Sequence, residues 1–216
     1  NAGTVSSFTR HQLQAYMAAQ YRAPNMTLVA SGAVNHKQVV ALAEEKFRDL
    51  RSGAVGMPEA SRFVGGDKRT TDDLEQAHLT FAFPGVASGD DEAYTAQVYV
   101  GALGGGMSSR LFQEIREKRG LCYSIYAFAQ SHKDGGSIGI YTGTGEAEAG
   151  QIAPVVAGEM AALAQGATDA EINRAKAQLK SGLLMGRERP ANRAEQIASQ
   201  LFIHCRVTPM EEIMAK

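Results

Sequence analysis

The chain has 216 residues, of which 22 are basic and 23 acidic, so its formal net charge is −1 at neutral pH. This balance gives no general attraction to nucleic acid or to an anionic membrane. The hydrophobic and charged fractions, 44% and 21%, are typical of a globular protein. No apolar run approaches the roughly 18 residues that a membrane span needs, and the first ten residues lack the basic and apolar segments of a signal peptide.

Cysteine usage indicates a reducing compartment. The chain has two cysteines, Cys122 and Cys205, and two thiols in a chain of this size are typical of such a compartment. We therefore expect a cytoplasmic protein. Cys205 follows His204, but neighbours on a helix point in different directions, and this disfavours a catalytic Cys/His pair.

The first 50 residues predict a helix, a strand and a second helix. A capping box of Thr9 and Gln12 predicts a helix over 9–21, and "MTLVASG" (26–32) predicts a buried strand. Asn35 is placed to cap the second helix, with the apolar residues Val39, Val40, Ala43 and Phe47 on its inner face. One strand cannot form a sheet, so we interpret residues 1–50 as the tail of an incomplete domain. Residues 51–70, with four glycines and no period, predict a linker.

Residues 71–216 predict a second domain of class α+β. In "LEQAHLTFAFPG" the apolar residues Ala77, Leu79, Phe81 and Phe83 alternate, as in a half-buried strand. A hairpin is predicted from strands over 121–132 and 137–144, joined by "KDGG". Helices are predicted over 92–103, 108–119, 146–165, from Thr168, over 191–205 and from Thr208, and Thr168 with Glu171 makes a second capping box. We expect a mostly antiparallel sheet packed on paired helices, with the domain's last segment missing because the chain ends two turns into the final helix.

Metal and phosphate chemistry is not predicted. The sequence holds no H-x-x-E-H, H-x-x-E or C-x-x-C, and no two of its five histidines lie closer than 25 positions. Gly104, Gly105 and Gly106 follow a predicted helix, whereas a dinucleotide fingerprint follows a strand, and no G-K-[ST] ends the run. Two interpretations of these glycines stay open: a plain connector between helices, or a backbone that an extended peptide approaches closely.

The junction "REKRGLCYSIY" places Arg116 and Tyr123 across a corner between a helix and a strand. Most charges of "RLFQEIREKR" predict a solvated helix face with salt bridges. Arg116 lies on the last turn, and Tyr123 lies near the start of the strand. A guanidinium and a phenol at such a corner can donate hydrogen bonds to a carbonyl oxygen or to the oxyanion that forms from it. Ordinary packing is the alternative.

The run "LGGGMSSRLFQEIREKRGLCYSIYAFAQSHKDGGSIGIYTGT" resembles the C-terminal domain of pitrilysin-type zinc metallopeptidases, in particular bacterial relatives of the mitochondrial processing peptidase. "NMTLVASGAVNHKQVVALAEEKF" resembles the end of the N-terminal domain of the same family. The resemblance implies a two-domain repeat with the first repeat truncated. It also implies that Arg116 and Tyr123 hold the substrate at the scissile bond, and that Gly104, Gly105 and Gly106 match a glycine-rich substrate-recognition loop.

The function implied by this resemblance is that of a C-terminal fragment of a zinc endopeptidase that cleaves peptides or presequences. Zinc would belong to the intact parent, whose first domain carries the H-x-x-E-H motif, and we expect no metal and no activity in this chain alone. A peptide substrate and a homodimer or heterodimer are implied as well. The alternative is a non-catalytic peptide-binding or assembly subunit that pairs with a zinc-bearing partner.

Overall fold

The computed structural model describes residues 2–53, 56 and 59–215 of the chain. It divides into two compact units, Asn1–Glu59 with Arg187–Val207, and Ala60–Gly186 with Thr208–Lys216. The two units are described separately below. The domain boundaries predicted at residues 50 and 70 stay a prediction.

The first unit is helical. Its elements are α1 (Ala2–Ser6), α2 (Arg10–Gln20), the short 3-10 helix η1 (Ala23–Asn25), α3 (His36–Lys46) and α7 (Pro190–His204). The predicted capping box is confirmed, because the Gln12 amide donates to Thr9 Oγ1 at 3.2 Å and the Thr9 amide donates to Gln12 Oε1 at 2.8 Å. Asn35 caps α3 as predicted, accepting from the Gln38 amide at 3.3 Å.

The strand predicted over 26–32 is wrong. Residues 26–31 have no regular secondary structure, and 32–33 form a bend. The predicted inner face of α3 is also largely open, since Val40 and Phe47 are exposed. A strand is stable only beside a hydrogen-bonded neighbour, and in the described part of this unit no other segment forms one. The β-prone sequence therefore stays irregular.

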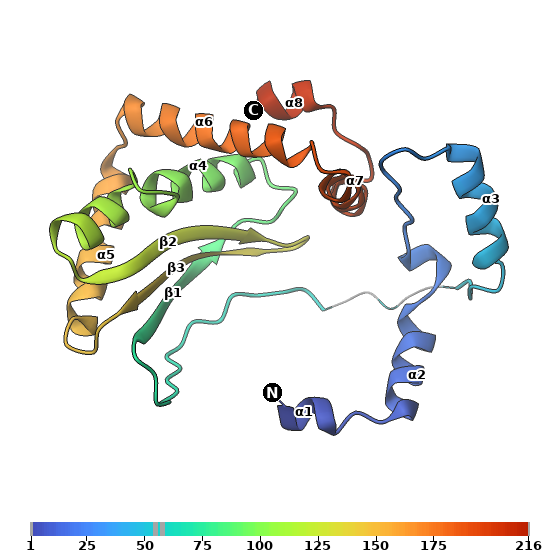
Figure 1. The fold of residues 1–216 in the computed structure, drawn as a ribbon, viewed down its shortest axis with the longest axis horizontal. Coiled ribbons are helices and arrows are strands. Elements are labelled where there is room, and N and C mark those ends of the chain that lie inside the picture. Colours follow the sequence, from blue (N-terminus) through green and yellow to red (C-terminus); the bar gives the residue numbers. More distant parts are fainter. Residues whose placement is uncertain (1, 54–55, 57–58, 216) are drawn as a thin grey trace. The chain divides into compact units, whose positions relative to one another are not determined.

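The second unit contains a three-stranded sheet, and its α+β class is confirmed. The strands are β1 (Ala77–Gly85), β2 (Cys122–Ser131) and β3 (Gly136–Thr144), in the order β1-β3-β2, with both pairings antiparallel (Figure 1). The predicted hairpin is the β2–β3 pair. The predicted alternation of β1 is confirmed as well, since each residue of the apolar set is less exposed than its neighbours.

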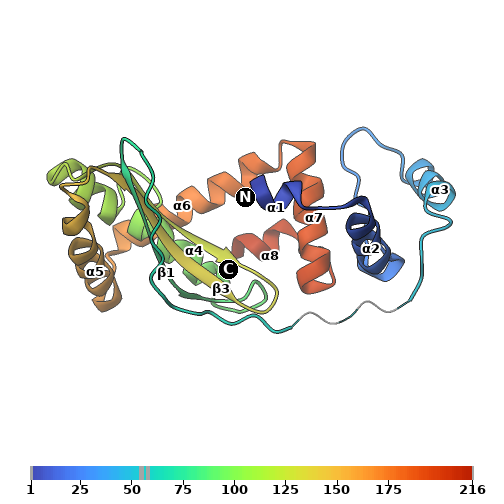
Figure 2. The same ribbon diagram turned by 90° about the horizontal axis from the view of Figure 1, so that it is seen from below.

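The helices of this unit lie on one side of the sheet. α4 (Ala93–Gly104) packs on β2 and lies between the sheet and α6 (Asp169–Gly186), and the unit also contains α5 (Ala149–Gln165) and α8 (Met210–Ala215) (Figure 1). Figure 2 gives the view from below, with α5 at one end of the sheet. The fully buried core side chains include Leu103, Leu111, Ile115, Ile140 and Ile152. In the part of the chain that the structure describes, no helix has the length and apolar character needed to cross a membrane.

The segment predicted as an α-helix over 108–119 is a π-helix for most of its length. Only 110–111 are α-helical, and η2 (Phe112–Lys118) is a π-helix. Its end is closed at Gly120, whose φ of +62° is the left-handed conformation that glycine adopts at little cost. The Leu121 amide then donates to the Ile115 carbonyl at 3.0 Å. Apolar spacing alone does not distinguish a π-helix from an α-helix, which explains the difference from prediction.

Candidate functional site

Arg116 and Tyr123 lie together at the corner between η2 and β2. The Arg116 Cζ atom is 5.4 Å from the centroid of the Tyr123 ring and 4.6 Å from that of the Phe112 ring. The guanidinium therefore contacts two aromatic faces, an arrangement that cation–π attraction favours. The pair that the sequence placed at this corner is thus brought within contact distance.

A β-bulge directs Tyr123 out of the sheet. Cys122 pairs with Thr144 and Ser124 pairs with Gly143, so Tyr123 is an extra residue without a partner across the ladder. Its side chain is 74% exposed. Bulges occur in strands where a side chain must be re-aimed, and this one presents a phenol beside Arg116.

Two buried threonines fix the backbone on either side of this bulge. Thr144 Oγ1 donates to the Leu121 carbonyl at 2.5 Å, and Thr142 Oγ1 donates to the Ser124 carbonyl at 3.0 Å. Both threonine side chains are buried on the helix-facing side of β3. The exposed phenol of Tyr123 is therefore attached to a backbone that these two hydrogen bonds hold in place. This limits the conformational entropy that is lost when Tyr123 binds a ligand.

Arg116 differs from the other basic residues of its segment. Arg110 is paired with Glu171, whereas Lys118 and Arg119 are paired with Glu114. Among the described residues, the Arg116 guanidinium makes no hydrogen bond or ion pair. Its ring contacts are those with Phe112 and Tyr123. Its N–H donors are available to an external acceptor, and its planar fork suits a carbonyl or carboxylate oxygen.

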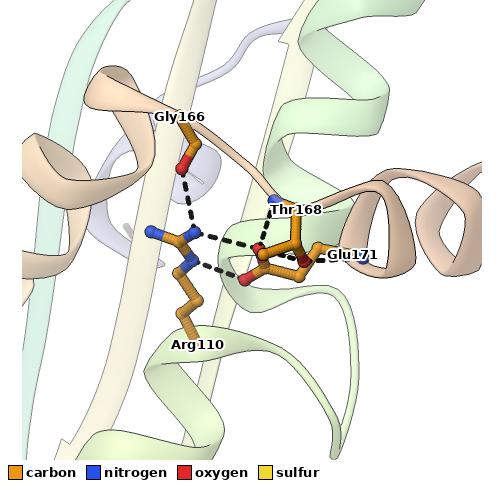
Figure 3. A network of polar contacts seen from close by, with 4 residues as sticks. All are labelled: Arg110, Gly166, Thr168 and Glu171. Carbon is orange, nitrogen blue, oxygen red and sulfur yellow. Dashed lines mark hydrogen bonds and ion pairs between the residues drawn. The ribbon is translucent and has the colours of Figure 1, made fainter.

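Sequence reasoning missed the partner of Arg110, which belongs to a network across three segments (Figure 3). Its Nε and Nη2 donate to the two Glu171 oxygens at 2.6 and 2.9 Å, and Nη2 also donates to the Gly166 carbonyl at 3.1 Å. Glu171 Oε2 accepts from the Thr168 amide at 2.8 Å, as the predicted capping box requires. The network holds the start of the η2 segment against the start of α6, and so helps to fix the corner.

This network lowers the pKa of Glu171 to about 2, from an ordinary value of 4.5. The main cause is the hydrogen bonding from Arg110, followed by the Thr168 amide. Glu171 is therefore ionised throughout the physiological range. No pattern in the sequence links residues 61 positions apart, although the box of Thr168 and Glu171 marked one end of the network.

The three glycines have different surroundings. Gly104 is the last residue of α4, and a Cβ there would lie 2.5 Å from the Ala127 amide nitrogen of β2. A Cβ on Gly105 would lie 2.6 Å from the Gly101 Cα. Close packing inside the fold therefore explains why neither Gly104 nor Gly105 carries a side chain. Gly106 has room, because the nearest atom to its Cβ position is Gln178 Nε2 at 3.6 Å.

Gly104→Ala is expected to lower the free energy of unfolding by about 1–3 kcal/mol, because the added methyl group forces α4 away from β2. Gly106→Ala is the matched control, and we expect it to leave stability within about 0.5 kcal/mol of the wild type. Urea unfolding followed by circular dichroism measures both. Equal stability of the two variants would contradict the packing role of Gly104.

The donor set does not fit a zinc site. Across the described ranges, no group of three or more His, Cys, Asp or Glu side chains is placed to hold a metal ion. His78, on β1, lies beside Tyr141, with Nδ1 2.7 Å from the hydroxyl, rather than among other ligand residues. We therefore derive no step through a metal bound to this chain.

The second unit thus combines a three-stranded antiparallel sheet, helices on one side of it, and a corner formed by Arg116 and Tyr123. A solved structure described as the peptidase M16 inactive domain from Pseudomonas fluorescens matches 99% of this chain and 52% of that chain, at a TM-score of 0.82 and 24% identity. A chain of Complex III2 from Candida albicans matches 99% of this chain and 53% of that chain, at a TM-score of 0.89 and 20% identity. At these identities the likeness shows the fold alone.

The family model for the peptidase M16 inactive domain matches residues 7–179, and the chain belongs to this family. An uncharacterized zinc protease of Rickettsia felis is 34% identical over 212 residues, which are 98% of this chain and 52% of that protein. One from Mycobacterium tuberculosis is 34% identical over 204 residues, 91% of this chain and 47% of that protein. The chain thus spans about half the length of these curated relatives, and the resemblance to pitrilysin-type metallopeptidases is confirmed.

Proposed function

We propose that this chain is the substrate-binding half of a zinc endopeptidase that cleaves peptides or presequences. The zinc-binding half would lie elsewhere, either in the same polypeptide or on a partner chain. We refer to the two halves together as the complete peptidase. The family membership supports a peptidase role, and the names of the relatives support zinc in the complete peptidase.

The observation that carries this proposal is the Arg116 guanidinium, which has no hydrogen-bonding or ion-pair partner among the described residues and lies beside the exposed Tyr123 phenol. A structural arginine at a half-buried position normally has a carboxylate or carbonyl partner, as Arg110 does. Arg116 instead has no acceptor for its N–H groups in the described part of the chain, while the rings of Phe112 and Tyr123 contact its guanidinium. This is the arrangement expected of a group that acquires its acceptor only when a ligand binds.

In the proposed mechanism, the Arg116 guanidinium and the Tyr123 hydroxyl donate hydrogen bonds to a carbonyl oxygen of the bound peptide. The same donors stabilise the negative charge that develops on oxygen when water adds to the scissile carbonyl. Of the three glycines proposed to bind substrate, Gly106 would let the peptide backbone pass close to the end of α4, whereas Gly104 and Gly105 would support this loop through their packing inside the fold. Activation of water is assigned to the zinc-binding half and to no residue of this chain.

The second candidate function is a non-catalytic subunit that binds peptides or completes the chamber of a zinc-bearing partner. The observation that favours it is the contact of Arg116 with Tyr123, which gives the guanidinium an internal partner even without substrate. Under either function we propose a peptide ligand, a homodimer or heterodimer, and a cytoplasmic location.

The two functions are separated by measuring zinc content and cleavage of a quenched fluorescent peptide on the same sample of the complete peptidase. The endopeptidase function predicts one zinc and cleavage that a chelator abolishes. A full-length polypeptide without zinc, which gains activity only when a second chain is added, would establish the subunit function instead.

A further inference from the structure

The face of the sheet away from the helices carries an aromatic cluster. Tyr126 of β2 pairs directly with Tyr141 of β3, and their ring centroids are 5.1 Å apart. Tyr141 also stacks on His78 of β1 at 5.9 Å, and Phe128 lies 6.0 Å from Tyr126. We name these four residues the aromatic shelf. It crosses all three strands of the sheet.

The aromatic shelf is built as a rigid surface. His78 Nδ1 and the Tyr141 hydroxyl are 2.7 Å apart, so a hydrogen bond fixes the orientation of both rings. The Phe128 ring fills the space that a side chain on Gly139 would need. Tyr126, held between Tyr141 and Phe128, is still 47% exposed. A fixed and half-exposed ring binds apolar groups with little loss of conformational entropy.

The aromatic shelf is continuous with the proposed substrate-binding corner. Cys122 packs against the core, and the bulge at Tyr123 interrupts the alternation, so that the next residue, Ser124, lies on the face that bears Tyr126. Tyr126 lies three positions after Tyr123 along the strand, a distance of about 10 Å. An extended peptide lying along β2 therefore reaches the shelf with a side chain about three residues from the carbonyl held by Arg116.

The lack of charged residues at the paired positions of this face determines which substrate side chain fits it. The paired positions on it contain no Lys, Arg, Asp or Glu; they are His78, Thr80, Ala82, Pro84, Ser124, Tyr126, Phe128, Gln130, Ser137, Gly139, Tyr141 and Gly143. A charged side chain placed there would lose hydration without gaining an opposite charge. An aromatic or large aliphatic side chain would bury apolar area and gain ring contacts.

We propose that the aromatic shelf is a specificity element that binds an aromatic or large aliphatic side chain of the peptide substrate, about three residues from the cleaved bond. This inference rests on the proposed function, because it takes its ligand from the peptide held at the Arg116–Tyr123 corner. It identifies residues that select among substrates, whereas the corner itself acts on the backbone of every substrate.

The test is cleavage of a positional peptide library by the complete peptidase. We expect a preference for Phe, Tyr or Leu over Asp and Lys at one position about three residues from the cleaved bond. Tyr126→Ala should reduce this preference roughly tenfold. Tyr126→Lys should shift the preference at that position toward Asp and Glu. Tyr16→Ala, which removes an exposed tyrosine of α2, is the matched control and should leave the preference unchanged.

The outcomes separate this inference from the function on which it rests. If cleavage depends on Arg116 but the library profile is the same in wild type, Tyr126→Ala and Tyr126→Lys, the shelf is not a specificity element. If the complete peptidase cleaves no peptide, or does so independently of Arg116, the proposed function itself is wrong. A reversed charge preference in Tyr126→Lys supports the inference even where Tyr126→Ala reduces stability.

Discussion

Arg116→Ala is expected to lower kcat/KM of the complete peptidase at least tenfold, a loss of about 1.4 kcal/mol of transition-state stabilisation. The reason is that its guanidinium, without a hydrogen-bonding partner among the described residues, donates to the substrate carbonyl and to the oxyanion that replaces it. The loss should affect all peptide substrates alike, because every peptide bond presents the same oxygen. Steady-state cleavage of a quenched fluorescent peptide measures the effect.

Two variants control for this substitution. Arg119→Ala removes a guanidinium of the same segment that is already paired with Glu114, and it should leave kcat/KM within about twofold of the wild type. Arg116→Lys keeps the charge but loses the planar fork, so it should recover only part of the activity. Unchanged kinetics in Arg116→Ala, with wild-type stability, would remove Arg116 from the mechanism.

Glu171→Gln is expected to lower the free energy of unfolding by about 3 kcal/mol at pH 7. Folding lowers the pKa of Glu171 from 4.5 to about 2, and each pKa unit corresponds to about 1.4 kcal/mol. A carboxyl whose pKa is lowered by folding contributes its full stabilisation above the unfolded pKa. That contribution is lost as the pH falls from 4.5 through 2, so the difference between wild type and Glu171→Gln should shrink over this range.

Urea unfolding at pH 7, 4.5 and 3 measures this pH dependence. Glu117→Gln is the matched control, since Glu117 is an exposed carboxylate of η2, and its stability should follow that of the wild type at every pH. A difference between wild type and Glu171→Gln that stays constant from pH 7 to pH 3 would contradict the assignment. It would indicate that Glu171 contributes through packing rather than through its charge.

Local signals in the sequence predicted most elements of the second unit and the first long helix of the other. The alternation at Ala77, Leu79 and Phe81 gave the face of β1, and "KDGG" gave the hairpin. The boxes of Thr9 with Gln12 and of Thr168 with Glu171 gave two helix starts. Each of these features depends on residues that are close in the chain, and such features are readable from one sequence.

Features that depend on tertiary contacts were not predictable. The bulge at Tyr123 depends on the buried hydroxyls of Thr142 and Thr144, which belong to another strand. The ion pair of Arg110 and Glu171 joins segments 61 residues apart. The segment 26–32 has the composition of a strand, but strand formation requires a neighbour. For the candidate site, Arg116 and Tyr123 were predicted from the sequence. The lack of an acceptor for Arg116 among the described residues and the bulge held by the two threonines were seen only in the structure.

The most direct test of the proposed substrate-binding corner is a structure of the complete peptidase with a non-cleavable peptide bound. We expect one peptide carbonyl oxygen within about 2.7–3.2 Å of both the Arg116 guanidinium and the Tyr123 hydroxyl. A bound peptide that leaves both side chains without contact to it, with Arg116 still stacked only on Phe112 and Tyr123, would contradict the central claim.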